Sequence, residues 1–179
     1  MREGTDTARG RAGIEVLLVI LATGAAVIEN MVPRPLPFIK PGLANVVTVA
    51  AVVRYGLLTG LRVNILRSTG AALIMGTLAT PAYLLSMAGG AASAAVMGTA
   101  RKFFSIPGMS VAGSLSSLWV QLLAASALIP GLPVSSLLLP VSLWGFLSGA
   151  VTGIVAAVLL RKGFLSSAAA GVDSVCAPE

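Results

Sequence analysis

Long apolar segments alternate with short breaks along the whole chain. Each segment is close to the roughly 20 residues that a helix needs to cross the hydrocarbon core of a bilayer. Proline, glycine and charged residues mark nearly all of the breaks, as is typical of connections between helices. The pattern predicts six transmembrane helices, at residues 13–30, 42–59, 62–80, 82–100, 109–129 and 134–160.

The composition agrees with an all-α integral membrane protein. The 179 residues are 56% hydrophobic and 10% charged, whereas about 25% of the residues in a soluble domain are charged. We expect an N-terminal tail at residues 1–12, a six-helix transmembrane domain at 13–162 and a loose C-terminal tail at 163–179. The basic residues stand singly or in pairs between apolar segments, which favours a role in membrane orientation and no binding of nucleic acid.

The distribution of positive charge predicts the orientation in the cell membrane. With six spans, nine of the twelve Lys and Arg residues fall on the side of the two termini or at its connections, and only Arg34 and Lys40 fall on the opposite side. Because Lys and Arg are enriched in cytoplasmic connections, we expect both termini to be cytoplasmic. The segment that holds Arg34 and Lys40 is then outside.

That outer segment, NMVPRPLPFIKPGLAN at residues 30–45, is rich in proline. Its Pro-x-Pro-x-Pro pattern fixes φ and favours an extended polyproline geometry. Pro41 suits the first position of the next helix, and the free N–H groups of a helix N-terminus attract anions. The segment predicts either an outward-facing pocket rim for an anionic or polar solute or a rigid loop at the lipid headgroups. The residues expected at the rim are Arg34, Lys40, Gly42 and Asn45.

Other polar residues lie inside the predicted spans. Glu29 and Asn30 close the first span, where they would cap it, pair with the loop cations or contact a solute, and Glu29 would equally suit a cation. Gln121 either bonds a neighbouring helix or contacts a ligand. Arg67 and Glu15, expected near the cytoplasmic face, either extend to the interface or pair with each other, and Arg67 would also suit an anion.

Small residues recur at four-residue spacing in three of the predicted spans. Small side chains allow helix backbones to approach closely in lipid. We expect these stripes to pack within the bundle, and the alternative is that Ala22 and Ala26 dock another membrane subunit. The stripes are Ala22 and Ala26; Ser86, Gly90, Ala94 and Gly98; and Gly145, Gly149 and Gly153.

The chemistry of most enzymes is missing from the sequence. The chain has no histidine, which excludes His-based zinc sites and His-based acid–base catalysis. No pair of carboxylates within the membrane domain has the spacing of a carboxylate site, and no glycine-rich phosphate-binding loop is followed by Lys-Ser or Lys-Thr. We therefore expect no catalysis, no bound metal and no cofactor, and the energy for any transport would come from an ion gradient or from a partner.

Three stretches carry ordered motifs: IENMVPRPLPFIKPGLANVVTVAAV, LRVNILRSTGAALIMGTLATPAYLLSMAGGAASAAVMG and FSIPGMSVAGSLSSLWVQLLAA. In order and spacing they resemble the Gx transporter family, which is also labelled heptaprenyl diphosphate synthase component I. The resemblance is strongest at PLPFIKPGLAN, at the S-x-x-GG of residues 86–90 and at the FS-x-x-G-x-S-x-x-G of residues 104–113. The second of these motifs adds Ser86 to the candidate solute contacts.

The resemblance implies a six-helix protein similar to the substrate-binding S components of energy-coupling-factor transporters. In those systems a small membrane subunit binds a vitamin or a metal and works with a coupling membrane protein and two ATPases. The first outer loop helps to close the pocket, and Ala22 and Ala26 would resemble the stripe that meets the coupling protein. This chain has Ser117 and Leu118 where family members often carry His-Asn, so its ligand or affinity is expected to differ.

Two main functions follow from these observations. The first is a membrane substrate-binding or transport subunit that takes up a small solute from the outer side with partner subunits. The second is a non-catalytic membrane component of heptaprenyl diphosphate synthesis, because the chain lacks the Asp-rich motifs that hold Mg²⁺ and diphosphate. A structural scaffold in a membrane complex is the third.

Overall fold

The computed structural model describes residues 3–31 and 42–163, with side chains from Ala12 onward. This part of the chain is helical and contains no strand, which confirms the all-α fold class for the described residues. Arg34, Lys40, Pro41 and the predicted tail from residue 164 lie outside it. The helices are α1 (Glu3–Met31), α2 (Leu43–Tyr55), α3 (Leu57–Ile74), α4 (Pro81–Ala100), α5 (Ile106–Leu128) and α6 (Val134–Arg161).

Four of these helices are long and apolar enough to cross a membrane, namely α1 from Ala12, α4, α5 and α6. With 13 residues, α2 is about 20 Å long at 1.5 Å per residue, which is shorter than the roughly 30 Å of a hydrocarbon core. The helix α3 contains Arg62 and Arg67 and is not among the four. The bundle is that of a membrane protein, and four of the six predicted spans are both long enough and apolar enough to cross a bilayer.

Glycine sets the boundary that the apolar pattern missed. Gly56 has a φ of +96°, which residues with a Cβ rarely adopt. The helical structure is interrupted at this glycine, between α2 and α3. The predicted second span therefore ends at Tyr55 instead of residue 59, and α3 begins at Leu57 instead of residue 62. The break moves every residue of α3 deeper into its helix than the sequence predicted.

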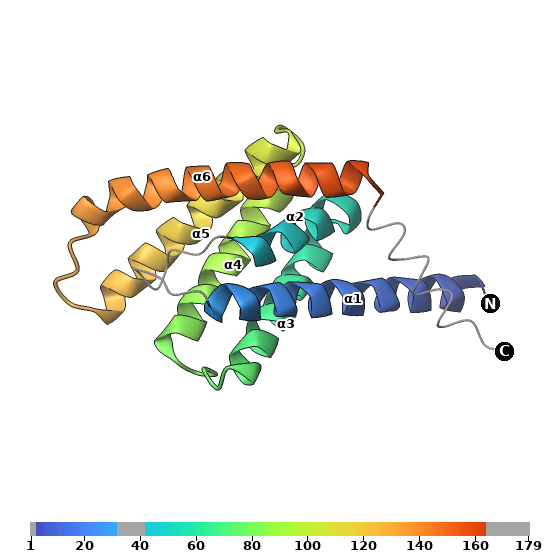
Figure 1. Ribbon diagram of the computed structural model, residues 1–179, viewed down its shortest axis with the longest axis horizontal. Helices are drawn as coiled ribbons and strands as arrows, with labels where there is room; N and C mark the ends of the chain where they lie inside the picture. The colour runs from blue at the N-terminus through green and yellow to red at the C-terminus, as the bar shows by residue number, and fades with distance from the viewer. Residues whose placement is uncertain (1–2, 32–41, 164–179) are drawn as a thin grey trace.

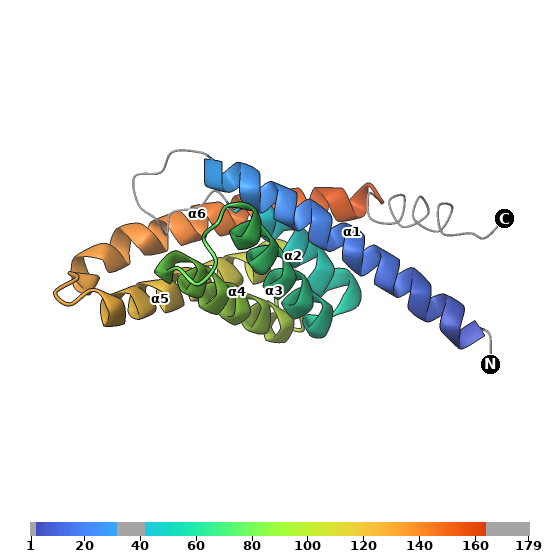
Figure 2. The ribbon, with the colours of Figure 1, turned by 90° about the horizontal axis from the view of Figure 1, so that it is seen from below.

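The short helix α2 lies in the middle of the bundle and contacts each of the other five helices. It has a continuous buried segment from Thr48 to Val52, as expected of a helix that is apolar on all sides. At its C-terminal end, the Val52 carbonyl oxygen accepts hydrogen bonds from the Gly56 N–H at 3.0 Å and from Arg101 Nη1 at 3.3 Å. Figures 1 and 2 show that the N-terminal part of α1 extends beyond this bundle.

Glycines bring α5 and α6 into close contact. A methyl group added at Gly149 would lie 2.7 Å from Val111 Cα, and one added at Gly153 would lie 2.6 Å from Pro107 Cα. On α4, a methyl at Gly98 would lie 2.7 Å from Leu57 Cδ1 of α3. The α4 and α6 stripes thus pack within the bundle, as predicted.

The stripe on α1 also faces inward, which agrees with the expected packing within the bundle and not with the alternative of a docking surface at Ala22. Ala22 is fully buried against α2 and α3 in a cluster with Leu18, Ala50 and Val63. Ala26 lines the internal cavity described below. The spacing of small residues shows that two helices meet closely, but it does not show whether the second helix belongs to the same chain.

The glycine contacts between α5 and α6 predict a difference in stability between two matched variants. Gly149→Ala should lower the free energy of unfolding by about 1–3 kcal/mol, because the new methyl group meets the backbone of α5. Gly24→Ala, with nothing within 4 Å of its new methyl group, should leave stability unchanged or raise it slightly. Thermal unfolding in detergent would compare the two, and equal melting temperatures would contradict the packing described here.

Candidate functional site

A cavity of about 230 Å³ lies among the helices and is lined by residues from all six of them. Polar groups make up much of its wall, although the surrounding bundle is apolar. The structure brings together most of the site residues predicted from the sequence, and Arg34 and Lys40 lie outside the described residues. The predicted residues that line the cavity are Glu29, Asn30, Gly42, Asn45, Arg67, Ser86 and Gln121.

Glu29 joins the end of α1 to the start of α2. Its side chain is 3% exposed, and its Oε1 accepts the Gly42 N–H at 2.7 Å while its Oε2 accepts the Ala44 N–H at 3.3 Å. A carboxylate at a helix N-terminus satisfies donors that have no partner within the helix. The prediction that these two donors are free for a solute is wrong, because the chain supplies the anion itself.

Gly42 allows this close junction. Its φ is +88°, and a methyl group added there would lie 2.9 Å from both Ser148 Oγ and Thr152 Cγ2 of α6. A side chain at this position would be strained in its backbone conformation and would push α6 away from α2. The predicted rim residue is therefore a structural glycine at the place where three helices meet.

Arg67 is the second charged group on the cavity wall. Its Nη2 and Nε donate to Asn64 Oδ1 at 2.8 Å and 3.2 Å, and it interacts electrostatically with Glu29. The sequence placed Arg67 one to two turns into its helix, near the cytoplasmic face and away from the outer segment. Because α3 begins earlier than predicted, Arg67 instead lies at the level of the cavity, together with Glu29 and Gly42.

The predicted alternative of a pair between Glu15 and Arg67 is also wrong. Glu15 Oε1 lies 3.5 Å from Arg62 Nη1 and accepts the hydroxyl of Thr59 at 3.3 Å. This ion pair is partly exposed, and such pairs contribute about 0–1 kcal/mol to stability. Glu15 is therefore a minor link between α1 and α3 and not part of the cavity.

Two buried polar groups at or near the cavity have no partner among the described residues. Asn64 is fully buried and Ser93 is 2% exposed, and neither Asn64 Nδ2 nor Ser93 Oγ forms a hydrogen bond. Ser93 lines the cavity, and so does Gly90, where an added methyl group would overlap the Asn64 amide. Asn64 and Ser93 were not among the residues predicted from the sequence, although a polar residue three positions before an arginine in an apolar segment was a usable signal.

Hydroxyl and amide groups complete the wall. Tyr83 Oη lies 3.1 Å from Thr69 Oγ1, and Gln121 Nε2 donates to Ser117 Oγ at 3.0 Å. An added methyl at Gly89 would meet the Gln121 amide at 2.5 Å, so this glycine makes room for the glutamine. The described residues contain no group of three His, Cys, Asp or Glu side chains that could hold a metal ion. The arrangement suits hydrogen bonding to a small polar molecule.

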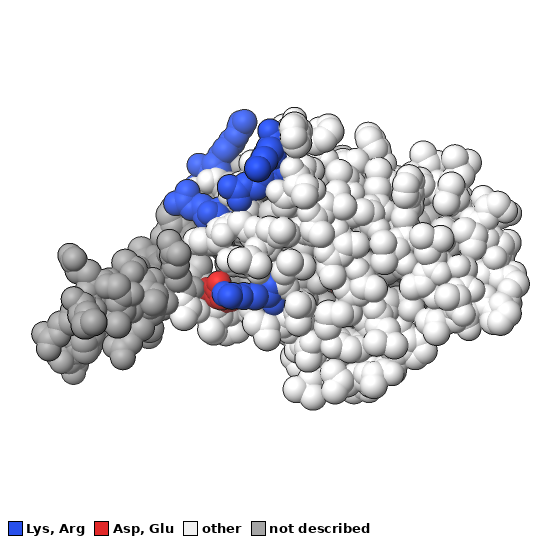
Figure 3. Space-filling view, turned by 180° about the vertical axis from the view of Figure 1, so that it is seen from behind, with Lys and Arg blue, Asp and Glu red and all other residues white. Residues whose placement is uncertain are grey.

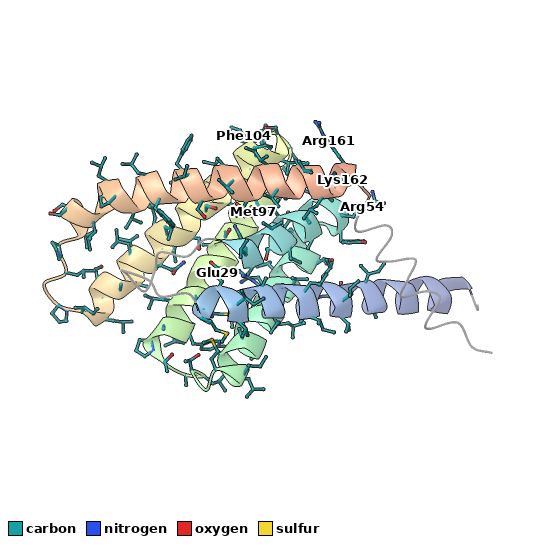
Figure 4. The ribbon with its side chains drawn as sticks, viewed as in Figure 1. Glu29, Arg54, Met97, Phe104, Arg161 and Lys162 are labelled. Carbon is teal, nitrogen blue, oxygen red and sulfur yellow. The ribbon has the colours of Figure 1, made fainter. Side chains whose placement is uncertain are left out.

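A second charged feature lies at one end of the molecule, and we call it the basic surface. It consists of Arg54, Arg101, Lys102, Arg161 and Lys162, which form no ion pair with the described residues. Phe103 and Phe104 lie beside it, 83% and 61% exposed. The charged side chains of one face gather at this end, and the rest of that face is uncharged (Figure 3). Glu29 is well separated from Arg54, Arg161 and Lys162 (Figure 4).

The fold and the cavity define an all-helical membrane protein with a polar interior site. The chain belongs to the family described as heptaprenyl diphosphate synthase component I, which it matches over residues 18–159. This confirms the resemblance that the sequence showed to the family under this label. No curated protein matches the chain, and no solved structure does.

The junction at Glu29 predicts a specific loss of stability. Glu29→Ala should destabilise the protein by about 1–3 kcal/mol, because the Gly42 and Ala44 N–H groups would be left without acceptors. Glu29→Gln keeps one acceptor oxygen and should lose less. Hydrogen exchange in the first turn of α2 should accelerate in Glu29→Ala.

Glu15→Ala is the matched control for this experiment, since it removes a carboxylate from the same helix at a partly exposed pair. Its exchange rates in α2 should equal those of the wild type. Equal protection of the first α2 turn in Glu29→Ala and Glu15→Ala would show that Glu29 does not hold α2.

Proposed function

We propose that this protein is a membrane-embedded binding subunit that takes a small polar solute into the cavity from the outer side and relies on partner subunits for energy. The observation that carries the proposal is the position of Arg67. An ionisable residue within a membrane span costs about 2.5–3.5 kcal/mol on insertion scales, and such residues usually mark a pathway or a site. Arg67 lines a polar cavity and forms no ion pair with the described residues.

The charges also support a direction of entry. Lys and Arg are enriched on the cytoplasmic side of membrane proteins, so the basic surface is proposed to face the cytoplasm, together with both termini. The Glu29 end of α1 and the start of α2 then face outward. A solute would enter from that side, past the segment at residues 32–41, which connects the two helices. Arg34 and Lys40 belong to this segment and remain candidates for guiding an anionic solute.

Partners are part of the proposal because the sequence has no phosphate-binding loop of its own. A coupling membrane subunit with ATPases, as in the transporters that the sequence resembles, would provide the energy. The inward position of Ala22 means that this subunit would dock elsewhere than on the Ala22 and Ala26 stripe. The lipid-facing side of α1 offers Val16, Ile20 and Ile28 instead.

Filling the cavity tests the binding function. Ser86→Trp should place an indole in the cavity, whereas Leu84→Trp, on the same helix and 55% exposed, should face lipid. Native mass spectrometry of protein purified from its own membranes should detect a bound small molecule in the wild type and in Leu84→Trp. Its occupancy should fall at least tenfold in Ser86→Trp. Equal occupancy in the two variants would argue against the cavity as the site.

A second candidate function is a non-catalytic membrane component of heptaprenyl diphosphate synthesis. The family description names a component of that synthase, and the basic surface, with the exposed Phe103 and Phe104, offers a place for a soluble catalytic partner. This surface lies away from the cavity, so the two functions are tested separately.

Co-purification tests this second candidate. A prenyl diphosphate synthase activity should accompany the protein from its own membranes, and it should fall severalfold when Arg101→Gln and Lys102→Gln are combined. Arg62→Gln is the control, because Arg62 is a cation that is already paired with Glu15. Absence of synthase activity from the wild-type preparation would contradict the second candidate and leave the first untouched.

A further inference from the structure

The part of the cavity beside Arg67 is rich in hydrogen-bond donors. Ser93 is a residue of the cavity wall, and its buried hydroxyl has no partner among the described residues. Arg67 has five N–H donors, of which Nη2 and Nε each give one to Asn64. A buried polar group without a partner costs about 1–3 kcal/mol, so a cluster of this kind indicates a ligand that supplies acceptors.

Asn64 bonds one edge of the Arg67 guanidinium, the edge formed by Nε and Nη2. Its Oδ1 accepts from both Nε and Nη2, which fixes the plane of the guanidinium and leaves Nη1 with its hydrogens for another acceptor. Asn64 is fully buried and lies behind Gly90, the glycine of the cavity wall that leaves room for its amide. A neutral acceptor at this position orients the arginine without cancelling its charge.

The charges on the wall limit the ligand to one negative group. Arg67 and Glu29 are the only charged residues of the described chain that line the cavity, and the Glu29 carboxylate is already bound to the start of α2. Arg67 forms no direct ion pair with the described residues, although the Glu29 carboxylate acts on it at longer range. One cation without a directly bonded carboxylate suits a monocarboxylate. A diphosphate would bring two or more charges to a single arginine and would also meet Glu29.

The neutral groups on the wall describe the rest of the ligand. Tyr83 is the only aromatic residue among the described lining residues, so the wall offers no pair of rings for stacking a planar ligand. Most other polar groups there are hydroxyls, which both donate and accept hydrogen bonds. They come from Ser68, Thr77, Ser86, Ser114, Ser117 and Ser148. The cavity volume of about 230 Å³ limits the ligand to a small molecule.

We infer that the solute is a small, non-aromatic hydroxycarboxylate whose carboxylate binds Arg67, and that Asn64 is the residue that positions Arg67. This inference rests on the proposed binding function and names its substrate class. The carboxylate accepts hydrogen bonds from the arginine, and the ligand hydroxyl groups exchange hydrogen bonds with the serines of the wall.

Two probes of equal shape test the inference, lactate and its neutral amide, lactamide. Ligand-observed NMR on the protein in lipid nanodiscs would measure both affinities. The wild type should bind lactate at least tenfold more tightly than lactamide. Asn64→Asp keeps an acceptor for Arg67 but neutralises its charge, so the preference for lactate should disappear in this variant. A purely structural role of Asn64 would lower both affinities together.

Arg67 provides a second pair of variants if Asn64→Asp does not fold. Arg67→Lys should keep part of the preference for the anion, and Arg67→Gln should lose it. An unchanged preference for lactate in Asn64→Asp or in Arg67→Gln would overturn the inference. Wild-type protein that binds neither probe while retaining a solute that Ser86→Trp displaces would also overturn it and leave the binding function standing. The binding function itself would be rejected if neither probe bound in the NMR experiment and mass spectrometry also found no solute that Ser86→Trp displaces.

Discussion

The structure depends on how the polar start of α2 is satisfied inside an apolar bundle. This helix is shorter than a bilayer and contacts all five others, so its first N–H groups lie where a missing acceptor costs several kcal/mol. Glu29 supplies the acceptors from the neighbouring helix. That one carboxylate fixes the end of α1 against the start of α2, and the room left around this junction becomes the cavity.

The sequence predicted the fold class but only part of the geometry. Apolar segments of the right length identified α4, α5 and α6 closely, because length and hydropathy are properties of single segments. The division of α2 from α3 depends on the backbone conformation of Gly56, which the apolar pattern did not reveal. The inward position of Ala22 depends on which side of α1 meets α2 and α3, and this is decided by packing across the whole bundle.

The sequence predicted which residues line the cavity, but it did not predict which groups they form hydrogen bonds with. Polar side chains in an apolar chain are few, so Glu29, Arg67 and Gln121 were found from the sequence. Their partners were not, since Glu29 bonds backbone groups across a connection whose length the sequence gives but whose path it does not. Asn64 was missed because an asparagine in a span usually suggests a bond between helices, whereas here it bonds Arg67 of its own helix and orients the guanidinium.

The two candidate functions use opposite chemical features of one molecule. The cavity combines a cation with a carboxylate and is lined by neutral donors and acceptors, which suits a small solute. The basic surface has several cations beside exposed phenylalanines and suits an acidic partner or an anionic headgroup. The cavity and the basic surface occupy different parts of the molecule. The family description and a binding role are therefore compatible.

The glycine contacts between α5 and α6 have a consequence for how this protein can change. Such an interface loses almost no side-chain entropy when it forms, because glycine has no side chain to immobilise. Where glycine meets backbone, no flexible atoms could yield to a larger side chain, so we expect larger residues to be tolerated mainly on the outside of the bundle. Lipid-facing positions such as Leu139, Leu147 and Ile154 are interchangeable with other apolar residues. Fluorescent labels or stabilising substitutions are best placed there.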